Sequence, residues 1–130
     1  MFSYQTTIKM HNIDAAGRLF FADQFVIAHD AWEACLDAKG LSISAMLEQC
    51  SFVTPVVHAE ADYQAPVTVG EVVTVNVSCE AAGKRSFTIG FAVMTEVAVG
   101  QGRHVHAVVD KVTGEAIAIP DSLRDVLDRI

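Results

Sequence analysis

The sequence predicts an α+β protein in which an antiparallel sheet wraps around one long helix. The one long stretch with helical periodicity begins at Phe21 and ends near Lys39. From Phe52 onward, nearly all of the chain reads as strands, several of which alternate between apolar and polar residues as half-buried strands do. Short turn signals separate these strands, which favours antiparallel neighbours within a single domain over residues 1–130.

The N-terminal third is expected to hold a strand, a turn, the long helix and a short second helix. Residues 2–10 alternate roughly and predict a strand, and residues 11–20 form a turn. One face of the long helix carries an apolar stripe that we expect to be core: Phe21, Phe25, Ala28, Trp32, Cys35 and Leu36. Gly40 is placed to end this helix, and Ser42 is placed to cap a second helix through about Glu48.

The rest of the chain is expected to form short-turned strands, followed by a terminal helix that opens at Pro120. The predicted strands are Phe52–Tyr63, Glu71–Ala81, Arg85–Val97, Arg103–Lys111 and Glu115–Ile119. Breaks are expected at Ala65-Pro66, Gly83, Thr113-Gly114 and Gly100-Gln101-Gly102, the last of which is a hairpin signal. One helix cannot cover both faces of such a sheet, so its bare face and edges are expected to meet a second copy.

Composition and charge narrow the class of protein. Hydrophobic residues make up 52% of the chain and charged residues only 19%, which suggests a buried subunit interface. The net charge of −7 argues against a nucleic-acid partner. No apolar run is long enough to cross a membrane, and the N-terminus lacks a secretory signal pattern. Cys35, Cys50 and Cys79 show no CxxC spacing, so we expect reduced thiols in a cytoplasmic protein.

The turn before the long helix holds the residues of greatest chemical interest. Asp14 places a carboxylate in a tight turn with Gly17, shortly before the helix N-terminus. Free backbone N–H groups and the positive end of the dipole let a helix N-terminus hold an anion or polarise a carbonyl. An acid beside such a donor is what hydrolysis of an activated acyl group needs. The alternative is that Asp14 only caps the helix.

The pattern around Asp14 resembles that of a known family. The run Asp14-Ala15-Ala16-Gly17, two residues, then Phe20-Phe21 is similar to the D-x-A-G-x-x-[FYW]-[FY] turn of the hotdog-fold acyl-CoA thioesterases, the 4-hydroxybenzoyl-CoA thioesterase family. Further stretches that resemble this family are Thr54–Ala59, Tyr63–Pro66 with Gly70-Glu71, and Gly83–Phe87. Phe20-Phe21-x-x-Gln24-Phe25 with Pro55-x-Val57-His58-Ala59 is most similar to the 1,4-dihydroxy-2-naphthoyl-CoA thioesterases. The order of elements agrees over essentially the whole chain.

The resemblance implies roles for three residues of the turn. Asp14 would attack the thioester carbonyl or activate the water that does so. Gly17 would let the backbone turn closely. The backbone N–H of Phe21 would be the oxyanion donor, while its side chain is expected to lie in the core.

Substrate contacts are expected from Gln24, from His58 and from the basic hairpin Lys84-Arg85-Ser86. Gln24 borders the apolar stripe, where it orients water or substrate, or is a surface residue. His58 lies in an apolar strand, where it contacts substrate or is a hydrogen-bonded core or interface residue. Cations at the tip of the hairpin would hold the phosphates of CoA, and the alternative is a solvated turn.

His104 and His106 face the same side of a strand, but no third ligand follows at a sensible spacing. We therefore expect no metal site. No redox cofactor is expected either, because CoA arrives as part of the substrate.

The sequence therefore predicts a hotdog-fold hydrolase of acyl-CoA thioesters, with an aromatic acyl group favoured and 1,4-dihydroxy-2-naphthoyl-CoA as a candidate substrate. It is expected to be a homo-oligomer, a dimer or a dimer of dimers, with sites formed between subunits and no nucleic-acid or membrane partner. Two alternatives remain open. One is a thioesterase for short- or medium-chain aliphatic acyl-CoA or acyl-carrier-protein substrates, and the other is a hotdog protein that binds acyl-CoA without hydrolysing it.

Overall fold

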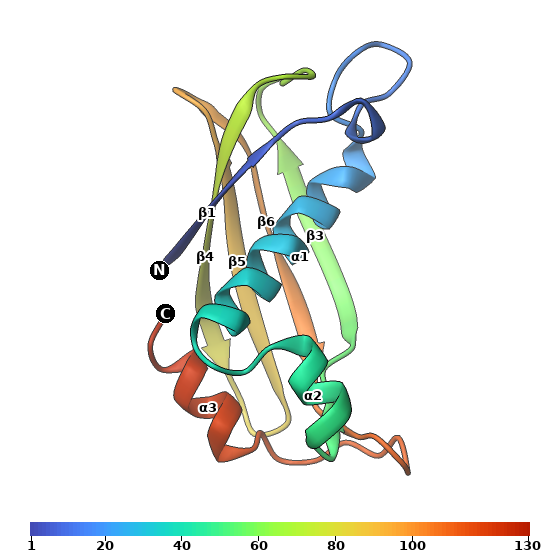
Figure 1. Cartoon of the computed structure of the whole chain (residues 1–130), viewed down its shortest axis with the longest axis vertical. Coiled ribbons are helices and arrows are strands. Elements are labelled where there is room, and N and C mark those ends of the chain that lie inside the picture. Colours follow the sequence, from blue (N-terminus) through green and yellow to red (C-terminus); the bar gives the residue numbers. More distant parts are fainter.

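A computed structural model describes all 130 residues and shows a five-stranded sheet with one long helix lying across it (Figure 1). The strand order is β1-β4-β5-β6-β3, and every neighbouring pair is antiparallel. The strands are β1 (Phe2–Thr7), β3 (Val56–Tyr63), β4 (Val72–Ala82), β5 (Ser86–Met94) and β6 (Ala98–Ala107). The predicted class, an antiparallel sheet around one long helix, is confirmed.

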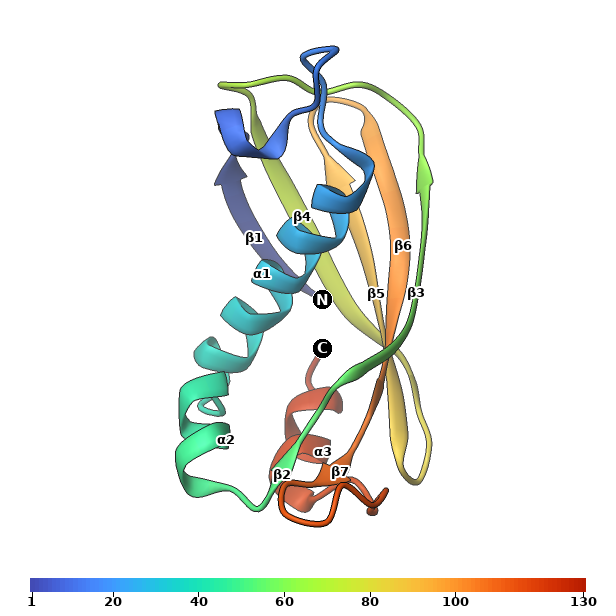
Figure 2. The same ribbon diagram turned by 90° about the vertical axis from the view of Figure 1, so that its right-hand side faces the viewer.

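The sheet curls around helix α1, with β1 and β3 at its two edges (Figures 1 and 2). The remaining elements are a 3-10 turn (Met10–Asn12), α1 (Phe21–Ala38), α2 (Ile43–Gln49), α3 (Asp121–Leu127) and a small sheet of β2 (Phe52–Val53) and β7 (Val109–Asp110). Figure 2 shows α1 against one face of the sheet, with the opposite face uncovered. None of the helices combines the length and apolarity that a membrane crossing requires.

The core lies between α1 and the inner face of the sheet. Trp32 is fully buried at its centre and packs against Phe87 of β5, with ring centroids 5.8 Å apart. Most of the predicted stripe is confirmed, because Ala28, Trp32, Cys35 and Leu36 are buried. The prediction that the Phe21 side chain lies in the core is wrong, since it is 60% exposed. Its ring rests on that of Phe20 at the start of the helix instead of over the sheet.

The predicted end of α1 and the predicted start of α2 are confirmed. Gly40 follows α1 with a φ of +84°, a left-handed conformation that glycine adopts without strain. Ser42 caps α2, because its Oγ accepts a hydrogen bond from the backbone N–H of Ala45 at 3.2 Å. These local signals positioned the helices correctly.

The predicted hairpin at Gly100-Gln101-Gly102 is wrong. Strand β6 runs straight through it, and the chain turns earlier, where the N–H of Thr95 donates to the carbonyl of Val97 at 2.9 Å. The glycines serve close packing inside the sheet. A Cβ on Gly100 would lie 2.3 Å from Oε1 of Gln24, and one on Gly102 would lie 2.1 Å from the carbonyl oxygen of Glu60.

Several predicted strands are shorter than expected. The first strand ends at Thr7, and the strand predicted over Phe52–Tyr63 is interrupted at Thr54-Pro55, where proline offers no N–H to a ladder. The strand predicted over Arg103–Lys111 is divided between the end of β6 and β7. No strand forms over Glu115–Ile119, where the one β-bridge joins Ala116 to Val109.

Candidate active site

Asp14 lies in a closed turn between the 3-10 turn and α1. Ile13 and Leu19 form an antiparallel bridge across the base of this turn. Inside it, the N–H of Asp14 donates to the carbonyl of Arg18 at 2.8 Å, and the N–H of Gly17 donates to the carbonyl of Asp14 at 3.0 Å. Gly17 has a φ of +79°, so the turn needs glycine at this position. The predicted role of Gly17 in a tight turn therefore agrees with its backbone geometry.

The carboxylate of Asp14 is held by its own turn and not by the helix. Oδ1 accepts hydrogen bonds from the N–H groups of Ala16 at 2.8 Å and Arg18 at 3.2 Å. Oδ2 has no partner within the chain, and the side chain is exposed. The N-cap residue of α1 is Phe20, which makes no side-chain cap. The alternative that Asp14 caps the helix is therefore wrong, and one carboxylate oxygen is free to react.

The N-terminus of α1 offers free hydrogen-bond donors next to this turn. The N–H of Phe20 donates to the carbonyl of Asn12, and that of Asp23 donates to the carbonyl of Phe20, both at 2.9 Å. Between them, the N–H groups of Phe21 and Ala22 have no acceptor in the chain. They stand at the positive end of an 18-residue helix, which favours a partial negative charge there.

Asp14 and Phe21 line one groove of about 410 Å³. A volume of this size is typical of small-molecule sites. The other residues that line it are Arg18, Leu19, Phe20, Gln24, Tyr63, Gln64, Ala65, Pro66, Val67 and Val99. The hydroxyl of Tyr63, at the end of β3, donates to the carbonyl of Phe21 at 2.9 Å and joins the first turn of α1 to the sheet. The groove thus brings a free carboxylate oxygen and free backbone donors to an aromatic-lined surface.

A second hollow, of about 390 Å³, carries a different chemistry. Its charged residues include Glu60, Glu80 and Arg103. The Arg103 guanidinium Nε lies 2.9 Å from a carboxylate oxygen of Glu60 and 3.6 Å from one of Glu80. Glu60 and Glu80 are thus paired with Arg103, and no helix N-terminus lines this hollow, so it lacks the backbone donors that the candidate active site offers.

Gln24 is buried at the groove, with 1% of its surface exposed. Its Nε2 donates to the backbone carbonyl of Asp62 in β3 at 3.2 Å. The alternative that Gln24 is a surface residue is therefore wrong. The amide ties the second turn of α1 to the edge of the sheet that ends at Tyr63.

Asn12 was not singled out from the sequence, yet it supports both halves of the site. It is buried, its Oδ1 accepts from the N–H of Lys9 at 2.9 Å, and its Nδ2 donates to Oδ2 of Asp23 at 3.1 Å. Its backbone carbonyl accepts from Phe20 as described above. Asn12 therefore connects the segment before Asp14 to the first turn of α1. The only feature of the sequence that could have indicated a role for Asn12 was its position two residues before Asp14.

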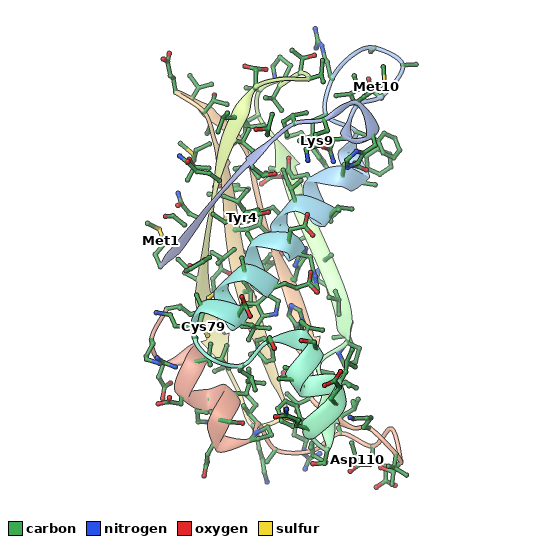
Figure 3. The ribbon with its side chains drawn as sticks, viewed as in Figure 1. Met1, Tyr4, Lys9, Met10, Cys79 and Asp110 are labelled. Atoms are coloured by element: carbon green, nitrogen blue, oxygen red, sulfur yellow. The ribbon has the colours of Figure 1, made fainter.

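The predicted CoA-binding residues lie away from the groove within one chain. Lys84, Arg85 and Ser86 are exposed in the β4–β5 hairpin, beside α3, where Ile119 donates to the carbonyl of Lys84. Figure 1 shows this hairpin at the end of the sheet opposite to the turn that carries Asp14. In Figure 3, Lys9 and Met10 mark the end near the turn, and Asp110 marks the opposite end.

His58 is also outside the groove. It lies on β3 with an exposed side chain, and its Nε2 is 3.8 Å from a carboxylate oxygen of Glu60. The alternative that His58 is a core residue is therefore wrong for the isolated chain. Contact with substrate or with a second copy remains a prediction.

His104 and His106 belong to the core. The ring of His106 stacks on Phe87 with centroids 4.9 Å apart, and its Nδ1 lies 3.0 Å from the carbonyl oxygen of Thr54. The pKa of both rings is lowered to about 4, mainly by burial and in part by the nearby His29. No group of three or more His, Cys, Asp or Glu side chains is arranged to hold a metal ion.

The chain is similar to known thioesterases in sequence and in fold. Residues 8–127 match the thioesterase-like superfamily. A 1,4-dihydroxy-2-naphthoyl-CoA hydrolase from a Synechococcus species (strain CC9605) is 32% identical over 123 residues, which cover 90% of this chain and 83% of the relative. A hydrolase of the same name from Synechococcus elongatus is 28% identical over 97% of this chain and 94% of its own. The crystal structure of a 1,4-dihydroxy-2-naphthoyl-CoA thioesterase from Synechocystis superposes with a TM-score of 0.91 at 20% identity, covering 99% of this chain and 96% of that one.

Proposed function

The chain belongs to the thioesterase-like superfamily, and from this premise we propose that it hydrolyses the thioester bond of aromatic acyl-CoA substrates. One observation carries the proposal. Asp14, whose Oδ2 is free, and Phe21, whose backbone N–H is free, line the same groove. Thioester hydrolysis needs both a group that attacks or activates water and a donor for the developing oxyanion.

In the proposed reaction, the thioester carbonyl oxygen accepts a hydrogen bond from the N–H of Phe21. Asp14 acts by one of two routes. Its Oδ2 attacks the carbonyl carbon to form a mixed anhydride, which water then hydrolyses, or it takes a proton from the water that attacks directly. In both routes the C–S bond breaks, the electron pair leaves with the CoA sulfur, and the thiolate takes up a proton. The carboxylic acid is the second product.

An aromatic acyl group fits the lining of the groove, where Phe20, Phe21 and Tyr63 present ring surfaces. The two relatives described above are named as hydrolases of 1,4-dihydroxy-2-naphthoyl-CoA, and we propose this ester as the first substrate to test. We further propose that no metal or redox cofactor takes part, because attack and charge stabilisation are both supplied by the chain. The cytoplasm is the proposed compartment, since all three cysteines are free thiols.

We also propose a homo-oligomer, either a dimer or a dimer of dimers. β3 is an edge strand of eight residues with unpaired backbone groups, and Val56 and Val57 at its start are 42% and 61% exposed. Antiparallel pairing of two β3 strands reverses the second copy. This brings the partner's Lys84 and the partner's Arg85 toward the groove end of the first copy, where they would hold CoA phosphates.

The test is release of CoA thiol from a panel of aryl- and alkyl-CoA esters by the wild type and by Asp14→Asn. We expect the wild type to hydrolyse aryl esters and the substitution to lower kcat by at least about 10²-fold, as loss of a catalytic base or nucleophile does. Asp30→Asn, which changes an exposed carboxylate on α1, is the matched control and should retain full activity.

The outcomes separate the alternatives. Faster turnover of alkyl or acyl-carrier-protein esters would favour the aliphatic thioesterase. Binding of acyl-CoA without any thiol release, or equal rates for Asp14→Asn and the wild type, would refute the proposed catalytic role of Asp14.

A further inference from the structure

The orientation of the Gln24 amide can be assigned from its partner. Its Nε2 lies 3.2 Å from the carbonyl oxygen of Asp62, which can only accept a hydrogen bond. The nitrogen must therefore face Asp62, and Oε1 must be the atom that points elsewhere. Oε1 rests beside Gly100, where a Cβ would approach it to 2.3 Å. The absence of a side chain at Gly100 makes room for this oxygen.

Oε1 of Gln24 has no donor within the chain, although the residue is 99% buried at the groove. Several backbone N–H groups of the groove lining are already used. Those of Gln64 and Ala65 donate to the carbonyl of Val99, and that of Leu19 donates to the carbonyl of Val67. An acceptor that has no donor in the chain and is almost covered is normally satisfied by water or by a ligand. The groove therefore presents an acceptor that lacks a partner.

Gln24 follows the proposed oxyanion donor by three residues, which is a rise of about 4.5 Å along α1. An acyl group whose carbonyl oxygen is bound at the N–H of Phe21 can extend along this turn of the helix. An aromatic ring spans a similar length, so a ring substituent reaches the level of Gln24. The lining of the groove also includes the apolar side chains of Val67 and Val99.

We infer that Oε1 of Gln24 accepts a hydrogen bond from a hydroxyl group on the aromatic acyl portion of the substrate, and that Gln24 therefore determines specificity for hydroxylated aryl esters. The inference rests on the proposed thioesterase function and adds a residue that discriminates among its substrates. Preference for a hydroxylated ester arises because a bound ester without the hydroxyl covers Oε1 and displaces water from it without offering a hydrogen bond. The hydrogen bond from Nε2 of Gln24 to the carbonyl of Asp62 holds the amide oxygen in place.

The experiment compares kcat/KM for matched esters: 4-hydroxybenzoyl-CoA against benzoyl-CoA, and 1-hydroxy-2-naphthoyl-CoA and its 1,4-dihydroxy analogue against 2-naphthoyl-CoA. We expect the wild type to favour at least one hydroxylated ester by about 5-fold or more, the effect of one net hydrogen bond. Gln24→Met has a similar length but no strong acceptor, so the preference should fall to about 1.

Each preference is a ratio measured on one protein sample, so partial unfolding of a variant does not change it. Gln101→Met, an exposed glutamine on β6 that is not part of the groove, is the control and should leave the ratio unchanged. A wild-type ratio near 1 would overturn the inference while leaving the proposed function intact. An equal loss on hydroxylated and unsubstituted esters in Gln24→Met would also overturn it, and would assign Gln24 to water positioning or to structure.

Failure of the proposed function has a different signature, namely no thiol release from any ester. In that case the dissociation constants of the matching non-hydrolysable aryl-CoA thioethers test Gln24 alone. A preference of the wild type for the hydroxylated thioether that disappears in Gln24→Met supports the inference. Equal affinities in the wild type overturn it.

Discussion

Asn12→Ala removes a side chain that joins the segment before Asp14 to the first turn of α1. Two hydrogen bonds are lost. The first joins two neutral groups, the backbone N–H of Lys9 and Oδ1 of Asn12, at 2.9 Å, and the second runs from Nδ2 of Asn12 to the carboxylate of Asp23 at 3.1 Å. At about 1 kcal/mol for the first and about 2 kcal/mol for the second, the free energy of unfolding should fall by about 3 kcal/mol. With about 2.1 cal/mol/K of unfolding entropy per residue, this lowers Tm by about 11 °C for 130 residues.

The same substitution should lower kcat by about 10-fold with little change in KM, because it loosens the helix turn that carries the Phe21 N–H but leaves the groove lining intact. Thiol release at 25 °C and thermal unfolding followed by circular dichroism measure the two effects. Asn76→Ala is the matched control, since Asn76 accepts a hydrogen bond from Ser3 Oγ at 2.6 Å on the sheet face away from α1. It should cost less than about 1 kcal/mol and leave kcat unchanged. A lower Tm for Asn12→Ala with an unchanged kcat would refute the positioning role.

Two further predictions concern the core and the edge of the sheet. In the folded chain, burial depresses the pKa of His104 and His106 to about 4, so the unfolded chain binds more protons between about pH 6.5 and pH 4. The free energy of unfolding should therefore be highest above pH 6.5 and should fall as the pH is lowered through that window. The expected loss is up to about 3 kcal/mol for each ring. Urea denaturation at pH 7 and pH 4.5 measures this loss, and His106→Phe should reduce it; equal losses would contradict the assignment. Light scattering should show at least two copies in solution, and Val57→Lys on the edge of β3 should shift the protein toward monomer whereas Val112→Lys in an exposed loop should not. A monomeric wild type would refute pairing through β3.

The parts of the fold that the sequence predicted correctly depend on local signals. The apolar periodicity of α1, the glycine after its end and the serine before α2 each act within a few residues. The turn of Asp14 is similar, because its hydrogen bonds all close within five residues and require a glycine at position 17. Such local structure can be predicted from the sequence because the residues that form the pattern are the same residues that adopt the helix, cap or turn.

The parts that were predicted incorrectly depend on partners far along the chain. Gly100 and Gly102 look like turn residues until Gln24 and Glu60, from other elements, are seen to occupy the space of their side chains. The burial of Gln24 follows from the carbonyl of Asp62, which is 38 residues away. In both cases the deciding contact is tertiary. The CoA-binding role of Lys84 stays a prediction, because the sequence of one chain does not position a second copy.

The proposed oxyanion role of the Phe21 N–H would account for the missing side-chain cap at the N-terminus of α1. Phe20 stands where Ser, Thr, Asp or Asn would stabilise a helix by about 1 kcal/mol, and Asp14 directs its bonded oxygen to its own turn instead. A cap would satisfy N–H groups of the first turn in the ground state, whereas an empty donor contributes only when the oxyanion forms. Asn12, through Asp23, and Tyr63, through the carbonyl of Phe21, hold the same turn by contacts that leave these N–H groups free. The helix start is thus stabilised from its side while its donors remain available to the substrate.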